Sequence, residues 1–223
     1  MGYDIDLSKI SIDNYKDIIR STHLISSWII LKDTIHNLDI IKSKGVENLR
    51  ELQQILNRKD RLLEFSKRSG IPESYLSVVR RMINGYIRKP NRLKDFPETP
   101  AYIVEKLENI GIKHTRHFFD KILTEKDRRC LSEETEIHYK EILRLTKLTD
   151  LSRIRWVNHT FAFVLYEAGY DSLEKVANSD PNQLYTTIKK MNTERKIYQA
   201  HIGLNDIKML KESAQLLPLD ITY

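Results

Sequence analysis

The residues that could hold a metal ion or act as a nucleophile are few and scattered. Among seven histidines, His114 and His117 are three apart and would share a helix face, but no cysteine or paired carboxylate completes a zinc pattern. Cys130 is the single cysteine. Two arginines precede it, a setting that favours a reactive thiol, yet it aligns with Leu63, 67 residues earlier, which predicts a buried and unreactive side chain.

Nucleotide chemistry finds no support in the motifs either. The chain lacks the phosphate-binding loop of nucleotide hydrolases, the nucleophile elbow and the dinucleotide fingerprint. The sequence therefore predicts no metal, no cofactor and no catalytic residue, and we expect a protein that is not an enzyme.

Basic residues, in contrast, are concentrated in one segment. The net charge is +6, and residues 61–95 carry nine basic and three acidic side chains, which accounts for the whole excess. Such a segment attracts a polyanion, but it is also typical of a solvated helix face whose acidic partners come from elsewhere in the fold. The candidate phosphate contacts in this segment are Arg80, Arg81, Arg88, Lys89 and Arg92.

One predicted helix would position most of these cations. The apolar spacing predicts a helix over about 73–88, which ends before Lys89 and Pro90. Arg81 and Arg88 are seven residues apart and would share a face, with Arg80 about 100° away. Together they could follow a phosphate backbone, where each neutralised phosphate adds affinity by counterion release.

Three glycines mark the ends of three similar helix-turn-helix segments. Gly45, Gly111 and Gly169 each close an apolar helical pattern and precede one apolar residue and a new helix start. The second and third segments align without a gap at a spacing of 58. A glycine after a helix end adopts the left-handed conformation at little cost, so we predict that conformation at all three. The predicted caps of the next helices are Asn48, His114 or Thr115, and Asp171 or Ser172.

The composition and this periodicity predict an all-α fold. The chain has 40% hydrophobic and 30% charged residues with only seven glycines and six prolines, and its apolar residues favour helical spacing. Segments of this size cannot bury their apolar faces alone, so we expect them to stack into one elongated array. The predicted divisions are an N-terminal arm and helix at 1–24, a diverged unit with the basic helix at 25–92, a second unit at 93–150, and a third unit with a C-terminal helix at 151–223.

The stretch LSRIRWVNHTFAFVLYEAGYDSLEKVA at 151–177 resembles a helix-hairpin-helix unit. With EKLENIGIKHTRHFFDKI at 105–122 and the KDR helices, the chain from about residue 25 onward resembles the family called domain of unknown function 4332. The resemblance implies a fold of tandem helix-hairpin-helix-like units and carries no assigned activity. Units of this kind generally bind DNA without reading its sequence, through the backbone N–H groups of a Gly-apolar-Gly hairpin and the following helix N-terminus.

The hairpin glycines implied by this resemblance are missing here. Their positions hold Glu98 and Pro100 in the second unit, where Pro100 has no N–H group and Glu98 would repel a phosphate. The third unit has Trp156, which we interpret as a core or hairpin plug, and Asn158, which tolerates a left-handed backbone. The second hairpin is therefore predicted to be structural. The predicted phosphate site of the third hairpin is Arg153, Arg155 and Asn158.

Two hypotheses of different classes follow. The first is a non-enzymatic, sequence-independent DNA-binding module whose partner is double-stranded DNA. The alternative is a protein-protein interaction scaffold with degenerate hairpins, in which the apolar end 219–223 docks on an unknown protein. No run approaches the roughly 18 apolar residues of a membrane helix, the polar N-terminus argues against a secretory signal, and one cysteine forms no internal disulfide. We therefore expect a cytoplasmic protein without a membrane partner.

Overall fold

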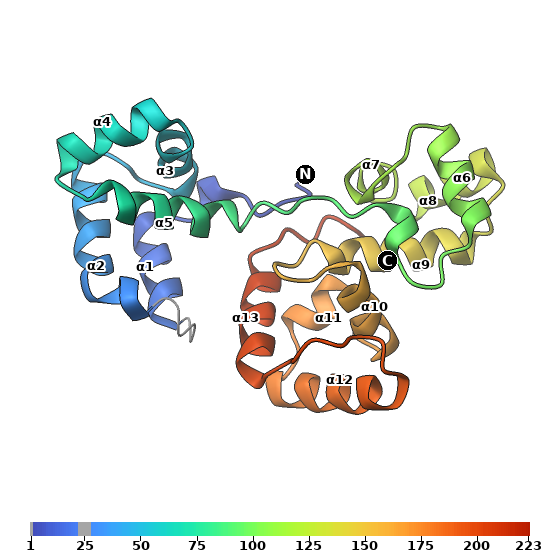
Figure 1. The fold of residues 1–223 in the computed structure, drawn as a ribbon. Coiled ribbons are helices and arrows are strands. Elements are labelled where there is room, and N and C mark those ends of the chain that lie inside the picture. The colour runs from blue at the N-terminus through green and yellow to red at the C-terminus, as the bar shows by residue number, and fades with distance from the viewer. Residues whose placement is uncertain (1, 22–27) are drawn as a thin grey trace. The chain divides into compact units, whose positions relative to one another are not determined.

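Every regular element in the described part of the chain, residues 2–21 and 28–223, is a helix in this computed structural model (Figure 1). Two isolated bridges accompany the helices in these ranges, Ser11 with Asn48 and Arg92 with His114. The predicted all-α class is confirmed. Within the same ranges, none of the helices combines the length and the apolar character needed to cross a bilayer.

The chain divides into two units. The N-terminal unit is Ile5–Ile87, and the C-terminal unit combines Met1–Asp4 with Arg88–Tyr223. The predicted division between residues 24 and 25 lies outside the described residues.

The described residues of the N-terminal unit form a 3-10 helix and five α-helices. Helix α1 packs on α2, and α3, α4 and α5 pack on one another. Leu49, Leu52 and Leu56 of α3 have no exposed surface, since positions i, i+3 and i+7 lie on one helix face. The elements are η1 (Leu7–Lys9), α1 (Ile12–Ser21), α2 (Trp28–Ser43), α3 (Leu49–Leu56), α4 (Lys59–Ser69) and α5 (Glu73–Asn84).

The C-terminal unit is organised around α9, which packs on α7, α8 and α10, while α13 packs on α11 and α12. Leu145, Leu148 and Leu151 of α9 are fully buried. The elements are η3 (Leu93–Asp95), α6 (Ala101–Asn109), α7 (Thr115–Phe119), α8 (Glu125–Thr135), α9 (Tyr139–Ser152), α10 (His159–Glu167), α11 (Leu173–Ala177), α12 (Pro181–Arg195) and α13 (Leu204–Gln215).

The three glycines adopt the predicted conformation. Gly45, Gly111 and Gly169 have φ of 84°, 85° and 86°, in the region that favours glycine. After the last two, the N–H groups of Ile112 and Tyr170 return to carbonyls of the preceding helix at 2.9 and 3.0 Å, as Schellman ends do. The next helices are capped by the side chains of Asn48, His114 and Ser172.

Helices of equal length recur at fixed spacings. Helices α6 and α10 have nine residues each and start 58 residues apart, as do the five-residue α7 and α11. Helices α4 and α8 have eleven residues each and start 66 apart. The predicted spacing of 67 for this last pair was therefore wrong by one residue.

This shift of one residue changes the environment of Cys130. At a spacing of 66 it corresponds to Glu64, which is exposed, and not to the half-buried Leu63. Cys130 is itself exposed, so the predicted burial of its side chain was wrong.

The basic helix is shorter than predicted. Helix α5 ends at Asn84, with Gly85 as its C-cap, so Arg88 lies beyond the helix and belongs to the C-terminal unit. The shared helix face of Arg81 and Arg88 was thus a wrong prediction. The residues Gly85 and Tyr86 each donate to a carbonyl near the end of α5 and close its last turn.

The C-terminal end packs against its own unit. Helix α13 is the C-terminal helix predicted for the third unit. Beyond it, Ile221 is buried, the Thr222 N–H donates to the Leu123 carbonyl at 2.9 Å, and the Tyr223 hydroxyl donates to Asp150 at 3.0 Å. The apolar end therefore has a partner within the unit.

Candidate nucleic-acid interface

The hairpin between α9 and α10 forms a tight turn with an exposed tip. The Val157 N–H donates to the Ile154 carbonyl at 3.1 Å, and both side chains are fully buried. Between them, Trp156 has φ of 67° and is 44% exposed. The interpretation of Trp156 as a plug was wrong, because the buried neighbours on either side anchor the turn and leave the indole outside.

Asn158 has a different role from the one predicted. Its φ is −90°, and its side-chain oxygen caps α10 by accepting the Phe161 N–H at 2.8 Å. The left-handed residue of the hairpin is Trp156, two positions earlier. Asn158 thus stabilises the start of α10, in keeping with the preference of asparagine for N-caps.

Arg153 leaves the predicted phosphate site because it is buried, with 1% exposure. Its guanidinium binds the Asp150 carboxylate at 2.6 Å and lies over the Phe119 ring. It also donates to three backbone carbonyls, which belong to Gly2, Tyr3 and Pro218. These bonds occupy the guanidinium within the unit, so Arg153 is a structural residue.

Arg88 and Arg155 meet at this hairpin. Arg88 Nη2 donates to the Val157 carbonyl at 2.9 Å, and the Arg155 guanidinium carbon lies 4.2 Å from the centroid of the Trp156 ring. Burial lowers the pKa of Arg88, and the nearby charge of Arg155 acts in the same direction. Two half-buried guanidinium groups therefore lie at one turn, and exposed Lys89 follows Arg88 directly in the chain.

Two carboxylates lie near the candidate cations Arg88 and Arg92. The Asp4 carboxylate accepts the backbone N–H of Arg88 at 3.3 Å and forms an ion pair with Arg116. Arg92 is held by two bonds to Asp95, at 3.0 and 3.1 Å, so its guanidinium is already paired with a carboxylate.

Arg80 and Arg81 belong to a different unit from the hairpin. Both lie on α5, where Arg81 is exposed and Arg80 is half-buried. The five candidate phosphate contacts of the basic segment therefore belong to two separate units.

In the hairpin before α6, two residues interact with arginines of the same unit. Glu98 has φ of 56° and pairs with Arg195 at 3.0 Å, while Arg144 donates to the Pro97 carbonyl at 2.8 Å. Pro100 is the N-cap of α6 and makes no side-chain capping bond. This arrangement supports the predicted structural role of the second hairpin.

Most of the C-terminal unit matches a known protein family. Residues 99–217 match the family model described as Domain of unknown function (DUF4332), which covers α6 to α13 and the hairpin at Trp156 and begins one residue after Glu98. The chain belongs to this family. No curated protein and no solved structure matches the chain significantly.

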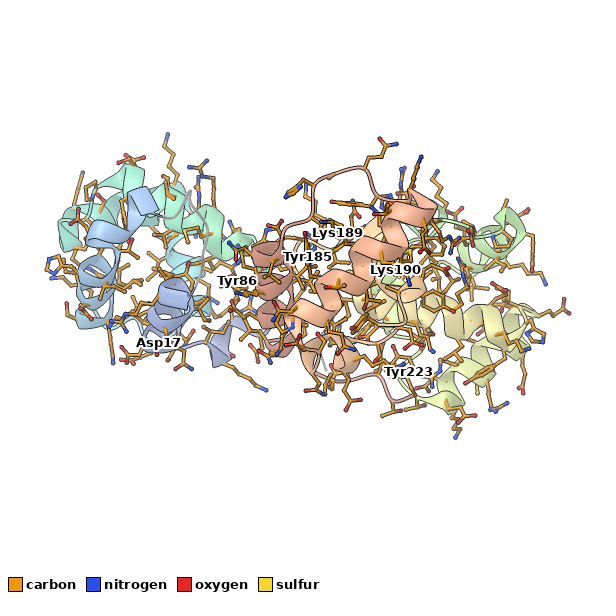
Figure 2. The ribbon with its side chains drawn as sticks, turned by 90° about the horizontal axis from the view of Figure 1, so that it is seen from below. Asp17, Tyr86, Tyr185, Lys189, Lys190 and Tyr223 are labelled. Carbon is orange, nitrogen blue, oxygen red and sulfur yellow. The ribbon has the colours of Figure 1, made fainter. Side chains whose placement is uncertain are left out.

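Two features of this DUF4332 protein escaped the sequence reasoning. Lys189 and Lys190 are exposed neighbours on α12, and the Lys189 ammonium lies 5.5 Å from the centroid of the Tyr185 ring (Figure 2). The two lysines are adjacent in the sequence. Residues 151–223 contain nearly equal numbers of basic and acidic residues, so the charge count of this segment did not single them out. The second feature is the exposure of Trp156, which depends on how the hairpin packs.

The rings of two predicted helix neighbours, His114 and His117, lie against each other. The rings of His114 and His117 lie 3.6 Å apart between centroids, and His114 Nδ1 accepts the His117 N–H at 3.3 Å. Burial lowers the pKa of His114, and the neighbouring His117 lowers it further. Across residues 2–21 and 28–223, no group of three or more His, Cys, Asp and Glu side chains is placed to hold a metal ion.

Proposed function

We propose that this protein binds nucleic acid without reading its sequence, through the backbone phosphates of DNA at the hairpin between α9 and α10. The observation that carries the proposal is the position of Arg88, which donates to the Val157 carbonyl and so lies directly beside the turn. Lys89 and Arg155 add two further positive charges at the same place. A cluster of cations at one exposed turn attracts a polyanion and adds affinity for each phosphate that it neutralises.

The backbone of the hairpin supports the same function. Helix α10 starts directly after the turn, and a helix N-terminus offers N–H groups and a partial positive charge to an anion. Among the first residues of α10, the Phe161 N–H donates to the Asn158 side chain and the Ala162 N–H donates to the Asn158 carbonyl.

The two hairpins resemble each other in their helices. Helix α6 has the same length as α10 and α7 the same as α11, and both pairs start 58 residues apart. This similarity favours a common origin of the two hairpins as helix-hairpin-helix-like units. In such a pair we infer that one hairpin binds and one is structural. The two hairpins differ in charge, because the first tip has the acidic Glu98 and the second has the basic Arg155 next to Trp156.

Fluorescence anisotropy of the full chain with a labelled duplex of about 20 base pairs tests this proposal. We expect micromolar dissociation constants at low salt and a steep loss of affinity as salt rises, because nonspecific binding depends on counterion release. Replacing Lys89 with glutamate should weaken binding and reduce the salt slope by about one or more.

Lys140→Glu is the matched control, since it makes the same change of charge at an exposed residue near the start of α9. Helix α9 separates it from the hairpin by about 20 Å. Equal weakening by both variants would mean that only overall charge matters, and absence of binding at low salt would reject the proposal.

A protein-interaction scaffold is the second candidate function. Tyr102 and Ile110, at the two ends of α6, are 54% and 40% exposed, and tyrosine is enriched at protein interfaces. A stoichiometric protein that co-purifies from native cells and resists nuclease would favour this function, provided that duplex binding is absent.

A further inference from the structure

Trp156 differs from the other exposed apolar side chains by its position. Single exposed hydrophobic residues are ordinary on a protein surface. Trp156, however, is an exposed indole at the tip of a turn whose flanking residues Ile154 and Val157 are fully buried. The burial of Ile154 and Val157 and the hydrogen bond between their backbones fix the backbone of the turn. The indole of Trp156 is therefore exposed on a rigid turn.

The backbone conformation of Trp156 is unfavourable for a tryptophan. Its φ of 67° lies in the left-handed region, which side chains with a Cβ atom rarely adopt. Glu98, 58 residues earlier, has the same backbone sign with φ of 56°, and its carboxylate is used in an ion pair with Arg195. The hairpin geometry thus imposes the conformation, and at the second of these tips the side chain is an aromatic ring.

The surroundings of the ring are cationic. The Arg155 guanidinium lies 4.2 Å from the ring centroid, a distance at which a guanidinium stacks on an indole. Arg88 binds the carbonyl of the next residue. Among the described residues, no other aromatic ring packs on Trp156. An aromatic ring among cations matches a ligand that carries both flat bases and phosphates, and every base offers a face for stacking.

We propose that Trp156 stacks on an unpaired base of the bound DNA while Arg88 and Lys89 contact the adjacent phosphates, so that this hairpin prefers single-stranded DNA or an unpaired segment next to a duplex. The inference rests on the proposed nucleic-acid binding and names its substrate class. A paired base inside a duplex has both faces covered by its neighbours, so only an unpaired base can take the indole as a partner.

Tryptophan fluorescence gives a direct test. The chain has two tryptophans, so a full-length Trp28→Phe variant reports on Trp156 alone. The probes are a twelve-residue thymidine strand and a strand of the same length and charge made of abasic sugar-phosphate units. We expect the thymidine strand to quench the fluorescence of Trp156 and the abasic strand to leave it nearly unchanged, because only the first has bases.

The affinity ratio of the same two probes gives the second readout. Replacing Trp156 with alanine should weaken thymidine binding roughly 5- to 160-fold, the range of one base stack, and leave abasic binding unchanged. Trp156→Phe keeps an aromatic ring and should retain part of the preference. A variant that fails to fold would lose both probes, so the ratio separates stacking from misfolding.

The quenching and affinity results either support or overturn base stacking by Trp156. Equal quenching by both strands, or an unchanged affinity ratio in Trp156→Ala, would overturn the stacking role. If binding to both strands still fell with Lys89→Glu in that case, the proposed nucleic-acid binding would stand without the inference. Absence of binding to the thymidine strand, the abasic strand and the duplex would reject both.

Discussion

Arg153 and Asp150 form a buried ion pair at the C-terminal end of α9. Nη1 of Arg153 lies 2.6 Å from Oδ1 of Asp150, and their side chains are 0% and 4% exposed. The same guanidinium donates to the carbonyls of Gly2 and Pro218, so it joins residues near both ends of the chain to α9. The residue that the sequence suggested for phosphate binding therefore serves the architecture of the C-terminal unit.

Removing one partner of this pair should be costly. We expect Arg153→Ala to lower the free energy of unfolding by about 3–5 kcal/mol, because it leaves a buried carboxylate uncompensated. Urea denaturation followed by circular dichroism measures the change. Arg20→Ala removes an exposed pair with Asp17 and should cost about 1 kcal/mol or less; a similar loss in both variants would contradict the structural role of Arg153.

The C-caps of α4 and α8 offer opposite tests of the left-handed conformation. Gly70 has φ of 76° and Glu136 has φ of 50°, at positions 66 residues apart. A Cβ atom at Gly70 would meet nothing within 4 Å, so the cost of Gly70→Ala is conformational, about 1–2 kcal/mol. Glu136→Gly should raise stability by up to about 1 kcal/mol, since its pair with Lys106 is exposed and weak. Thermal unfolding of both variants checks the signs.

His114 should make stability dependent on pH below neutrality. Its pKa is lowered in the folded protein, first by burial and then by His117, so the unfolded chain binds the proton more readily. The stabilising contribution is therefore present above the ordinary histidine pKa of about 6.5 and is lost as pH falls through the folded pKa. Protonation of Nδ1 would also remove the acceptor that caps α7.

Two substitutions separate the cap of α7 from the titration. His114→Asn should keep the cap and flatten the fall of melting temperature between neutral and mildly acidic pH, because asparagine is a good cap that does not titrate. His114→Ala should lower the melting temperature at every pH. An unchanged pH slope in His114→Asn would show that other groups cause it.

Asn158 allows stability and binding to be tested at one position. Asn158→Ala removes the cap of α10 and should cost about 1 kcal/mol. Asn158→Asp retains a capping oxygen, so stability should be kept, but it places a negative charge at the hairpin and should weaken DNA binding. Urea denaturation and anisotropy of the same samples give the two values. Normal DNA affinity in a stable Asn158→Asp variant would show that DNA binds elsewhere than at this hairpin.

Much of the local structure followed from the sequence. The left-handed glycines and the caps at Asn48 and Ser172 were predictable, because each depends on residues within a few positions along the chain. The end of α5 was predicted four residues too late. The apolar pattern continues past Asn84. The sequence marks the helix end most clearly at Pro90, and Gly85 and Tyr86, which form the turn, mark it less clearly.

The candidate site was predictable only in part. The third hairpin was identified from its residue types, and Arg155 was assigned to it, but Arg153 and Asn158 have other roles. Side chains three residues apart face different surroundings when a chain turns sharply, so Arg153 is buried in the unit while Trp156 is exposed. Their sequence spacing contains no such information.

The sequence by itself determined that this chain is helical, where its helices are capped and that its charge excess lies in residues 61–95, because propensity, capping and composition are local properties. Only the tertiary structure decided that Arg153 is buried, that Arg88 lies at the hairpin 69 residues away and that Trp156 is exposed. Burial and the meeting of distant residues depend on how the helices pack, and the packing of the whole chain sets which charges remain available to a ligand.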